Sequence, residues 1–339
     1  MKFDVTINTD DGYVQHAMAL LCSLFENNKS HEIIVHVLTG NLSRDKEDAI
    51  NALAMRYNSK CLFYHIDNSL LEGVKFRKNR PLSYAAYYRL LLSSVLDTGI
   101  SRVLYLDCDM IVLDDVSSIF SLEIDDYALA ATIDNTPCDD NHRKQLHMQV
   151  GDLTFCSGIM LINLNYWRKH QVEPKLLEYA KRDRERVYYH DQDALNYVFK
   201  HKWFVLPPKW NKYAYSNWLS KDICFRDYDR YEYMKKPIVI HYAALNIKPW
   251  LDCLSCNRNV YLKYLRMSGY QPVVFKHVSW SMKFKAFLNM VAYKYDIFVK
   301  PYLPKLIIII IEDLKFIIKI LVLILTGRIK NFTLLRDQE

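Results

Sequence analysis

The stretch Val103-Leu-Tyr-Leu-Asp-Cys-Asp-Met-Ile-Val112 sets two carboxylates, Asp107 and Asp109, between two apolar runs. A short continuous apolar run is typical of a strand that is buried on both faces of a parallel sheet. Ionised Asp side chains rarely lie there without a partner, and open α/β sheets bind ligands at the carboxyl ends of their strands. The stretch therefore predicts either a site for a hard divalent cation such as Mg²⁺ or Mn²⁺, or a solvated turn after a buried strand.

Strand and helix patterns alternate on both sides of this stretch. Expected strands before it cover residues 3–9, 32–38 and 61–66, and those after it cover residues 127–133, 155–163 and 237–242. We expect helices at residues 14–25, 81–92 and 164–184, a polar loop at 135–152, and a further helix opening at His190-Asp-Gln-Asp193. This alternation predicts an α/β fold with a mostly parallel central sheet.

Composition narrows the possible functions. Only 8 of the 339 residues are Gly, and neither of the common glycine-rich phosphate-binding patterns occurs. The 8 Cys are scattered, which favours free thiols in a reducing compartment over a disulfide framework. The amino terminus places Asp4 inside its only apolar stretch and carries no signal-peptide pattern, so we expect a cytoplasmic protein.

The positive charge is concentrated at the end of the chain. Residues 271–339 contain eleven Lys or Arg and five Asp or Glu, so they supply +6 of the net charge of +7. The nearly neutral remainder argues against nucleic acid as a partner of the main domain. We therefore expect a catalytic domain at residues 1–270 and a separate basic tail at 271–339.

The tail has the pattern of an amphipathic helix. On a helix through residues 306–325 the charged side chains fall within about 160° of arc and leave a broad Ile/Leu face. Such a helix fits the interface of an anionic membrane better than a span across it. Packing of the helix on the catalytic domain or on a second copy of the chain, and a transmembrane span, are the alternatives.

Other polar residues that could form a site follow predicted strands or open predicted helices. They are Asn8, Thr9, Asp10 and Tyr13 after the first strand, Arg89 among apolar neighbours, Asp134 after the strand at 127–133, Asp191 and Gln192 at a helix start, and His241 with Lys248 at the last strand. Each has an ordinary structural explanation, such as helix capping for Asp191 and a satisfied core histidine for His241. His241 ends its strand as the Asp pair does, and His joins carboxylates on Mn²⁺.

Several of these motifs together resemble glycosyltransferase family 8. The matching motifs follow the family's order and span roughly residues 1–265: the Asn8–Tyr13 loop, Tyr88-Arg89-Leu90, Leu104-Tyr-Leu-Asp-Cys-Asp109, Ser157-Gly158, Trp167-Arg168, Asp191-Gln-Asp193, and His241-Tyr242 with Lys248-Pro-Trp250. The resemblance implies a single domain of the glycosyltransferase A type. It also implies a retaining enzyme that transfers galactose or glucose from a UDP-sugar to a lipopolysaccharide or other glycan acceptor.

The resemblance also assigns roles to individual residues. Asp107, Asp109 and His241 would bind Mn²⁺ or Mg²⁺. Asn8, Thr9, Asp10, Tyr13 and Cys108 would hold the nucleoside, with Tyr13 stacking on the base. Arg89 and Lys248 would bind phosphate or sugar, and Asp134 and Asp191 the donor sugar hydroxyls, while Gln192 would lie beneath the anomeric face. Two departures from the family pattern are Cys156, where Asn is usual, and the glycine-free segment between His241 and Lys248.

Two other protein classes compete with this interpretation. Phosphatases of the haloacid-dehalogenase type also use Asp-x-Asp after a buried strand, but on their first strand and with Thr or Val at the position of Ile111. A catalytically inactive sugar-nucleotide-binding scaffold at the membrane is the other. The intact Asp107, Asp109, Gln192 and His241 argue against it, whereas Cys156 and the altered segment after His241 leave it open as an alternative.

Overall fold

The computed structural model describes residues 1–77, 83–134, 138–183, 186–214, 236–243, 248–251 and 256–298. The chain forms two compact units, Met1–Met290 and Val291–Glu339. The first unit holds every element described below, except that α10 (Trp280–Phe298) begins in it and continues past Met290. The expected helix at 306–325 and the segment 244–247 lie outside the described residues, and the predicted boundary at residue 270 stays a prediction.

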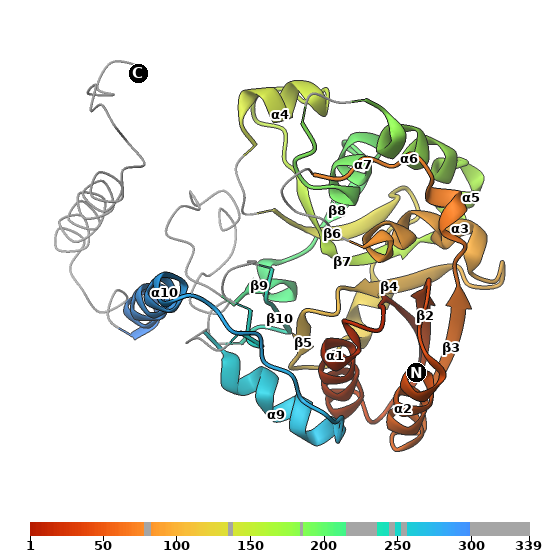
Figure 1. Cartoon of the computed structure of the whole chain (residues 1–339). Coiled ribbons are helices and arrows are strands. Elements are labelled where there is room, and N and C mark those ends of the chain that lie inside the picture. The colour runs from red at the N-terminus through yellow and green to blue at the C-terminus, as the bar shows by residue number, and fades with distance from the viewer. Residues whose placement is uncertain are drawn as a thin grey trace, which may run out of the picture. The chain divides into compact units, whose positions relative to one another are not determined.

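A seven-stranded sheet runs through the centre of the first unit, in the order β3-β2-β1-β4-β7-β6-β8 (Figure 1). Its strands are β1 (Lys2–Asn8), β2 (Glu32–Thr39), β3 (Lys60–His65), β4 (Arg102–Leu106), β6 (Leu129–Ile133), β7 (Phe155–Asn163) and β8 (Trp203–Val205). All neighbouring strands pair in parallel except at β7, which is antiparallel to both β4 and β6. The predicted mostly parallel α/β sheet is confirmed.

A second, three-stranded sheet decides the geometry of the site. It contains β5 (Met110–Val112), β10 (Val239–His241) and β9 (Lys212–Tyr213), with β10 between the other two. The apolar stretch from Val103 to Val112 is thus two strands in two sheets, and Asp107 and Asp109 lie in the turn between them. β5 pairs with β10 in antiparallel register, which sets His241 opposite Met110.

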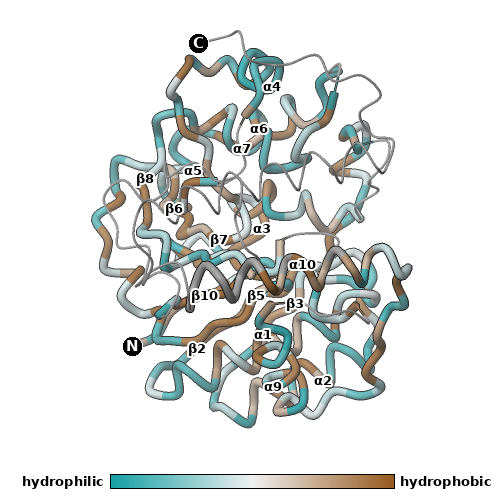
Figure 2. Tube along the Cα trace, turned by 90° about the vertical axis from the view of Figure 1, so that its left-hand side faces the viewer, coloured by the Kyte–Doolittle hydropathy of each residue, from teal (hydrophilic) through white to brown (hydrophobic). Residues whose placement is uncertain are grey.

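Helices cover both faces of the large sheet. One face carries α1 (Val14–Asn27), α2 (Arg44–Met55) and α9 (Arg258–Ser268), and the other carries the 3₁₀ helix η2 (Tyr84–Leu91), α3 (Leu92–Val95), α5 (Leu164–Lys169), α6 (Val172–Lys181) and α7 (Asp191–Val198) (Figure 1). Alternate residues of β4 follow this division, since Leu104 and Leu106 pack with the first group and Val103 and Tyr105 with the second. The brown tube of β2 in Figure 2 marks one of these buried strands.

Some predicted boundaries were wrong. The helix expected at 81–92 is mostly the 3₁₀ helix η2, and the helix expected at 164–184 is two helices, α5 and α6, separated by Gln171 at a φ of 47°. The expected loop at 135–152 contains the short helix α4 (Asp140–Gln145), whose N-cap Asp139 accepts from the His142 N–H. Three short 3₁₀ helices complete the described elements: η1 (Asn68–Leu71), η3 (Ser117–Ser121) and η4 (Pro208–Trp210). No helix among the described residues is long and apolar enough to span a membrane.

Candidate active site

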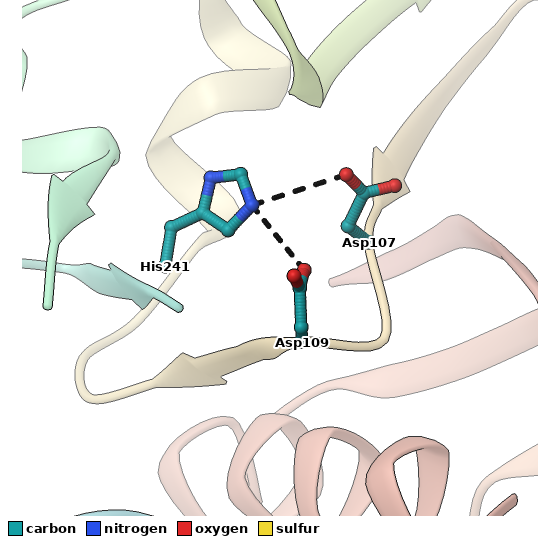
Figure 3. Close-up of side chains that lie close together, drawn as sticks. All are labelled: Asp107, Asp109 and His241. Carbon is teal, nitrogen blue, oxygen red and sulfur yellow. Dashed lines mark ion pairs between the residues drawn. The ribbon is translucent and has the colours of Figure 1, made fainter. Parts of the chain in front are cut away.

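Asp107, Asp109 and His241 meet where the two sheets diverge (Figure 3). Each offers one ligand atom, and these atoms lie within 4.8 Å of one another. His241 Nε2 is 3.2 Å from Asp109 Oδ1 and 3.9 Å from Asp107 Oδ2. The pairing of β10 with β5 brings the histidine there, and the Tyr242 N–H donates to the Asp109 carbonyl next to it. Two carboxylates and an imidazole are a donor set suited to Mn²⁺ or Mg²⁺.

Three further observations fit a cation at this cluster. Asp109 Oδ1 is buried and accepts no hydrogen bond among the described residues. A Cβ built on Gly158 would lie 2.5 Å from His241 Cε1 and 2.9 Å from Asp107 Oδ2, so only glycine leaves this space open. His241 Nδ1 lies 3.0 Å from Asn211 Oδ1, a contact that orients the ring so that Nε2 faces the carboxylates.

Lys248 and His241 offset the negative charge of the Asp109 carboxylate. Lys248 Nζ forms an ion pair with Asp109 Oδ2 and lies 5.4 Å from the Trp250 ring. Burial raises the pKa of Asp109, but Lys248 and His241 outweigh it and hold this pKa well below its usual range. Burial likewise opposes the charged form of His241, yet the Asp109 carboxylate raises the histidine pKa to about 10. Lys248 thus occupies one oxygen of a candidate metal ligand.

Arg89 connects the candidate metal ligand Asp107 to Asp191 at the start of α7. Its Nη2 donates to Asp107 Oδ1 at 2.7 Å, its Nε is 3.1 Å from Asp191 Oδ2, and its Nη1 donates to the Ser157 carbonyl at 2.8 Å. The guanidinium also lies 4.2 Å from the Tyr105 ring, and Tyr105 Oη donates to Asp107. Burial raises the pKa of Asp191 to about 6, although Arg89 lowers it. Arg89 therefore fixes the positions of both carboxylates.

Gln192 and Asp134 form the next part of the site. Gln192 Nε2 donates to Asp134 Oδ2 at 2.7 Å, and Gln192 Oε1 accepts from the Ser157 N–H at 2.9 Å. Asp134 Oδ1 is also 3.4 Å from Tyr213 Oη. Ser157 also accepts a hydrogen bond from Arg89, which bonds Asp107. Ser157 and Arg89 thus link Gln192 to the candidate metal ligands.

The predicted nucleoside residues cluster at the end of β1. Asn8 Nδ2 donates to the Ala85 carbonyl, while Asn8 Oδ1 is buried and accepts no hydrogen bond among the described residues. The Cys108 thiol donates to the Asn8 carbonyl at 3.2 Å, and so links this strand end to the Asp pair. Thr9 bonds back to Leu38, and Asp10 Oδ1 accepts the Gly12 N–H. Tyr13 meets the Trp250 ring edge-on at 5.7 Å.

Sequence reasoning missed three side chains that orient the site. Asn211 holds His241 and donates to Thr132, Ser157 joins Arg89 to Gln192, and Tyr105 bonds Asp107. Ser157 stands in one of the motifs that carried the resemblance, so its polar position beside a glycine was a usable signal. Asn211 offered none, because its neighbour His241 lies 30 residues away and joins it only through the pairing of β9 with β10.

Several known proteins are similar to this chain in sequence and in fold. The model of glycosyl transferase family 8 matches residues 4–253. General stress protein A of Bacillus subtilis is 29% identical over 251 residues, which are 71% of this chain and 85% of that protein. Lipopolysaccharide 1,2-glucosyltransferase of Escherichia coli is 27% identical over 284 residues, covering 81% and 83%. The crystal structure of the galactosyltransferase LgtC with donor and acceptor sugar analogs superposes with a TM-score of 0.69 at 23% identity, over 80% of this chain and 98% of that one.

Proposed function

The chain belongs to glycosyl transferase family 8, and from this premise we propose that it is a retaining, divalent-metal-dependent hexosyltransferase. It would move galactose or glucose from a UDP-sugar to a lipopolysaccharide or other glycan acceptor, as the names of relatives such as lipopolysaccharide 1,2-glucosyltransferase suggest. The observation that carries the proposal is the Asp107–Asp109–His241 cluster beside the bonded pair Gln192 and Asp134.

The residues divide into those that hold the donor and those that act on the scissile bond. Asn8 ends β1 with an acceptor oxygen that has no hydrogen-bond partner among the described residues, which suits an N–H of a pyrimidine base, and Asp10 and Tyr13 follow it in the loop before α1. Asp134 and Asp191 are acceptors for sugar hydroxyls. When bound at Asp107, Asp109 and His241, a divalent cation would neutralise charge on the leaving diphosphate. Lys248 is the chain's own cation for that charge.

Retention of configuration needs either a nucleophile beneath the sugar or attack by the acceptor on the face that the diphosphate leaves. Gln192 is an amide and a poor nucleophile. We therefore favour same-face attack, with Gln192 Oε1 directed at the positive charge that develops on the anomeric carbon. The hydrogen bond from Gln192 Nε2 to Asp134 supports this role, since it leaves Gln192 Oε1 on the side of Ser157. Gln192→Ala and Gln192→Glu should each slow transfer strongly, and full transfer by either variant would rule out this role.

The deciding assay measures metal-dependent UDP release from a panel of UDP-hexoses, with and without a glycan acceptor. Release that requires Mn²⁺ or Mg²⁺ and stops with a chelator supports the proposal, and NMR of the product should show an unchanged anomeric configuration. UDP-sugar binding without release would favour the inactive scaffold, and release of phosphate from phosphomonoesters would favour the phosphatase. Asp109→Asn should abolish release. Asp115→Asn, on an exposed carboxylate, is the matched control.

We further propose that residues 271–339 attach the enzyme to the inner face of the cytoplasmic membrane. This proposal depends on the basic and amphipathic sequence of the tail. In the described part, α10 carries exposed Trp280 and Phe284, with exposed fractions of 80% and 53%, near Lys283. Aromatic side chains beside lysines suit the interface of an anionic leaflet.

A further inference from the structure

A cysteine, a histidine and an aspartate form a chain of contacts that the proposed transfer reaction does not use. Cys138 precedes α4, His142 lies in α4, and Asp193 lies in α7. Cys138 Sγ is 3.2 Å from His142 Nδ1, and His142 Nε2 is 2.9 Å from Asp193 Oδ1. A thiol in contact with a base that a carboxylate orients is the arrangement that activates cysteine nucleophiles.

The surroundings of His142 favour its charged form. The carboxylates of Asp193 and Asp139 both contact this residue, one at the ring and one at the backbone N–H. The ring stacks on Tyr188 at 4.3 Å, and the Arg186 guanidinium lies 4.7 Å from the same tyrosine ring. Burial lowers the pKa of His142, but the bonds to Asp193 and Cys138 outweigh it and raise this pKa to about 9. At neutral pH the Cys138 sulfur therefore lies beside an imidazolium ion.

Among the described cysteines, Cys138 combines this contact with access to solvent. Cys22, Cys108, Cys156 and Cys256 are buried, whereas Cys61 and Cys138 are partly exposed. Cys61 has no such partner, and burial raises the pKa of its thiol to about 12. We propose that Cys138 is a modification site that reacts with low-molecular-weight disulfides.

The reaction is a thiol–disulfide exchange. The Cys138 thiol gives up its proton, and its sulfur attacks one sulfur of the disulfide. The S–S bond of the reagent breaks, a new S–S bond joins Cys138 to half of the reagent, and the other half leaves as a thiolate that takes up a proton. One disulfide and one thiol are consumed, and one mixed disulfide and one thiol are formed.

Modification at this position would disturb both residues of the pair Gln192 and Asp134. Asp193 Oδ2 accepts the N–H groups of Tyr188 and Tyr189, and the Tyr189 carbonyl accepts the N–H of Gln192. On the other side, Cys138 Sγ is 3.9 Å from Thr154 Oγ1, and the Thr154 carbonyl accepts the N–H of Asp134. An added group on Cys138 would displace the segments that make these hydrogen bonds to Gln192 and Asp134. The mixed disulfide should therefore inhibit transfer, an expectation that rests on the proposed function.

The test uses the full-length protein and 4,4′-dithiodipyridine, with release of 4-thiopyridone as the rate signal and peptide mass spectrometry to assign each labelled cysteine. At pH 7 we expect Cys138 to react at least roughly fivefold faster than Cys61, because its sulfur contacts the His142 ring and is partly exposed. The Cys138 rate should change little between pH 6 and 8, whereas an ordinary thiol gains roughly tenfold per pH unit below its pKa.

Matched variants separate the histidine's effect from simple exposure. Cys138→Ser should remove the fast phase and Cys61→Ser should keep it, while His142→Asn should slow the reaction and make it rise with pH. If His142→Asn does not fold, the flat pH profile of the unaltered protein still carries the test. A Cys138 rate equal to that of Cys61, or a rate that rises in the ordinary way with pH, would overturn the proposal. Because labelling is measured without any transfer assay, this result is independent of the enzyme's activity.

Discussion

Gly158 shows how one missing side chain can define a metal site. A methyl group there would meet His241, Met110 and Asp107 at 2.5–2.9 Å, and these atoms belong to well-buried or hydrogen-bonded groups that cannot move apart freely. We expect Gly158→Ala to weaken Mn²⁺ binding at least about tenfold, which corresponds to about 1.4 kcal/mol.

Isothermal titration calorimetry with Mn²⁺ measures this change directly. Gly99→Ala is a suitable control, since its new methyl group would meet only the flexible Asp97 side chain in the turn before β4. Equal Mn²⁺ affinity in Gly158→Ala and the unaltered protein would contradict the assignment of this cluster.

His142 provides a test of electrostatics within the fold. Its pKa rises to about 9 in the folded protein from an ordinary value near 6.5, so the charged form stabilises the fold fully below about pH 6.5. This stabilisation is lost as the pH rises through about 9. The difference of about 2.5 pKa units corresponds to about 3 kcal/mol.

Urea unfolding of the unaltered protein and of His142→Asn measures this difference. The gap between their unfolding free energies should be largest near pH 6 and shrink by about 3 kcal/mol by pH 10. A gap that stayed constant with pH would show that His142 does not carry the charge.

At the scale of elements, an aromatic cluster fastens the segment that carries Lys248. The Trp250 ring stacks on His16 of α1 at 3.6 Å and lies 5.7 Å from Tyr261 of α9. His16 Nδ1 is 2.8 Å from Tyr261 Oη, and burial lowers the pKa of His16 to about 3, so this ring is neutral. Two helices therefore position a segment that supplies a residue to the candidate active site.

Removing the indole should affect both stability and the site. Trp250→Ala should cost about 3–5 kcal/mol of unfolding free energy and also weaken UDP-sugar binding, because Lys248 is two residues away. Trp203→Ala in β8 is the control, and should lower stability with little effect on UDP-sugar affinity. Chemical denaturation and a fluorescence titration with UDP report the two effects. Unchanged UDP affinity in Trp250→Ala would show that the aromatic cluster does not position Lys248 for binding the nucleotide.

Some strands of the sheet could be predicted from the sequence and others could not. The strands before the Asp pair were recognisable because buried apolar runs end in polar residues, and β1, β2 and β3 occur within a residue or so of their expected bounds. The antiparallel direction of β7 could not be recognised, since a strand buried on both faces carries the same apolar pattern in either orientation. The break between β4 and β5 was hidden for the same reason. Contacts such as Asn211 with His241 depend on pairing between distant segments, which local patterns do not encode.

At the scale of the whole molecule, basic and apolar residues are concentrated toward the carboxyl end of the sequence. The full chain should therefore bind vesicles that contain anionic lipid more tightly than neutral vesicles, and raised salt should weaken this binding. The described structure also shows where a truncation belongs. Val274 N–H bonds to Gln15 and Lys276 N–H to the Trp250 carbonyl, so residues 271–290 are part of the first unit.

Co-sedimentation of the full chain and of a chain ending at Met290 measures the contribution of the second unit. The shortened chain should lose most of its vesicle binding. Trp280→Ser in the full chain, which removes an exposed indole from α10, should weaken binding less. A membrane-bound fraction that is the same with and without residues 291–339 would refute attachment through that part of the tail.

The ion pair between Lys248 and Asp109 has a consequence for the order in which ligands bind. A metal ion held through Asp109 Oδ1 would draw carboxylate charge away from Lys248 on Oδ2, and the donor's diphosphate would return a counter-charge to the ammonium. Each ligand thus lowers the cost of admitting the other, and by thermodynamic linkage the two affinities must rise by the same factor. Metal alone or nucleotide alone should therefore bind weakly, and Lys248→Met should reduce the factor by which each ligand strengthens binding of the other.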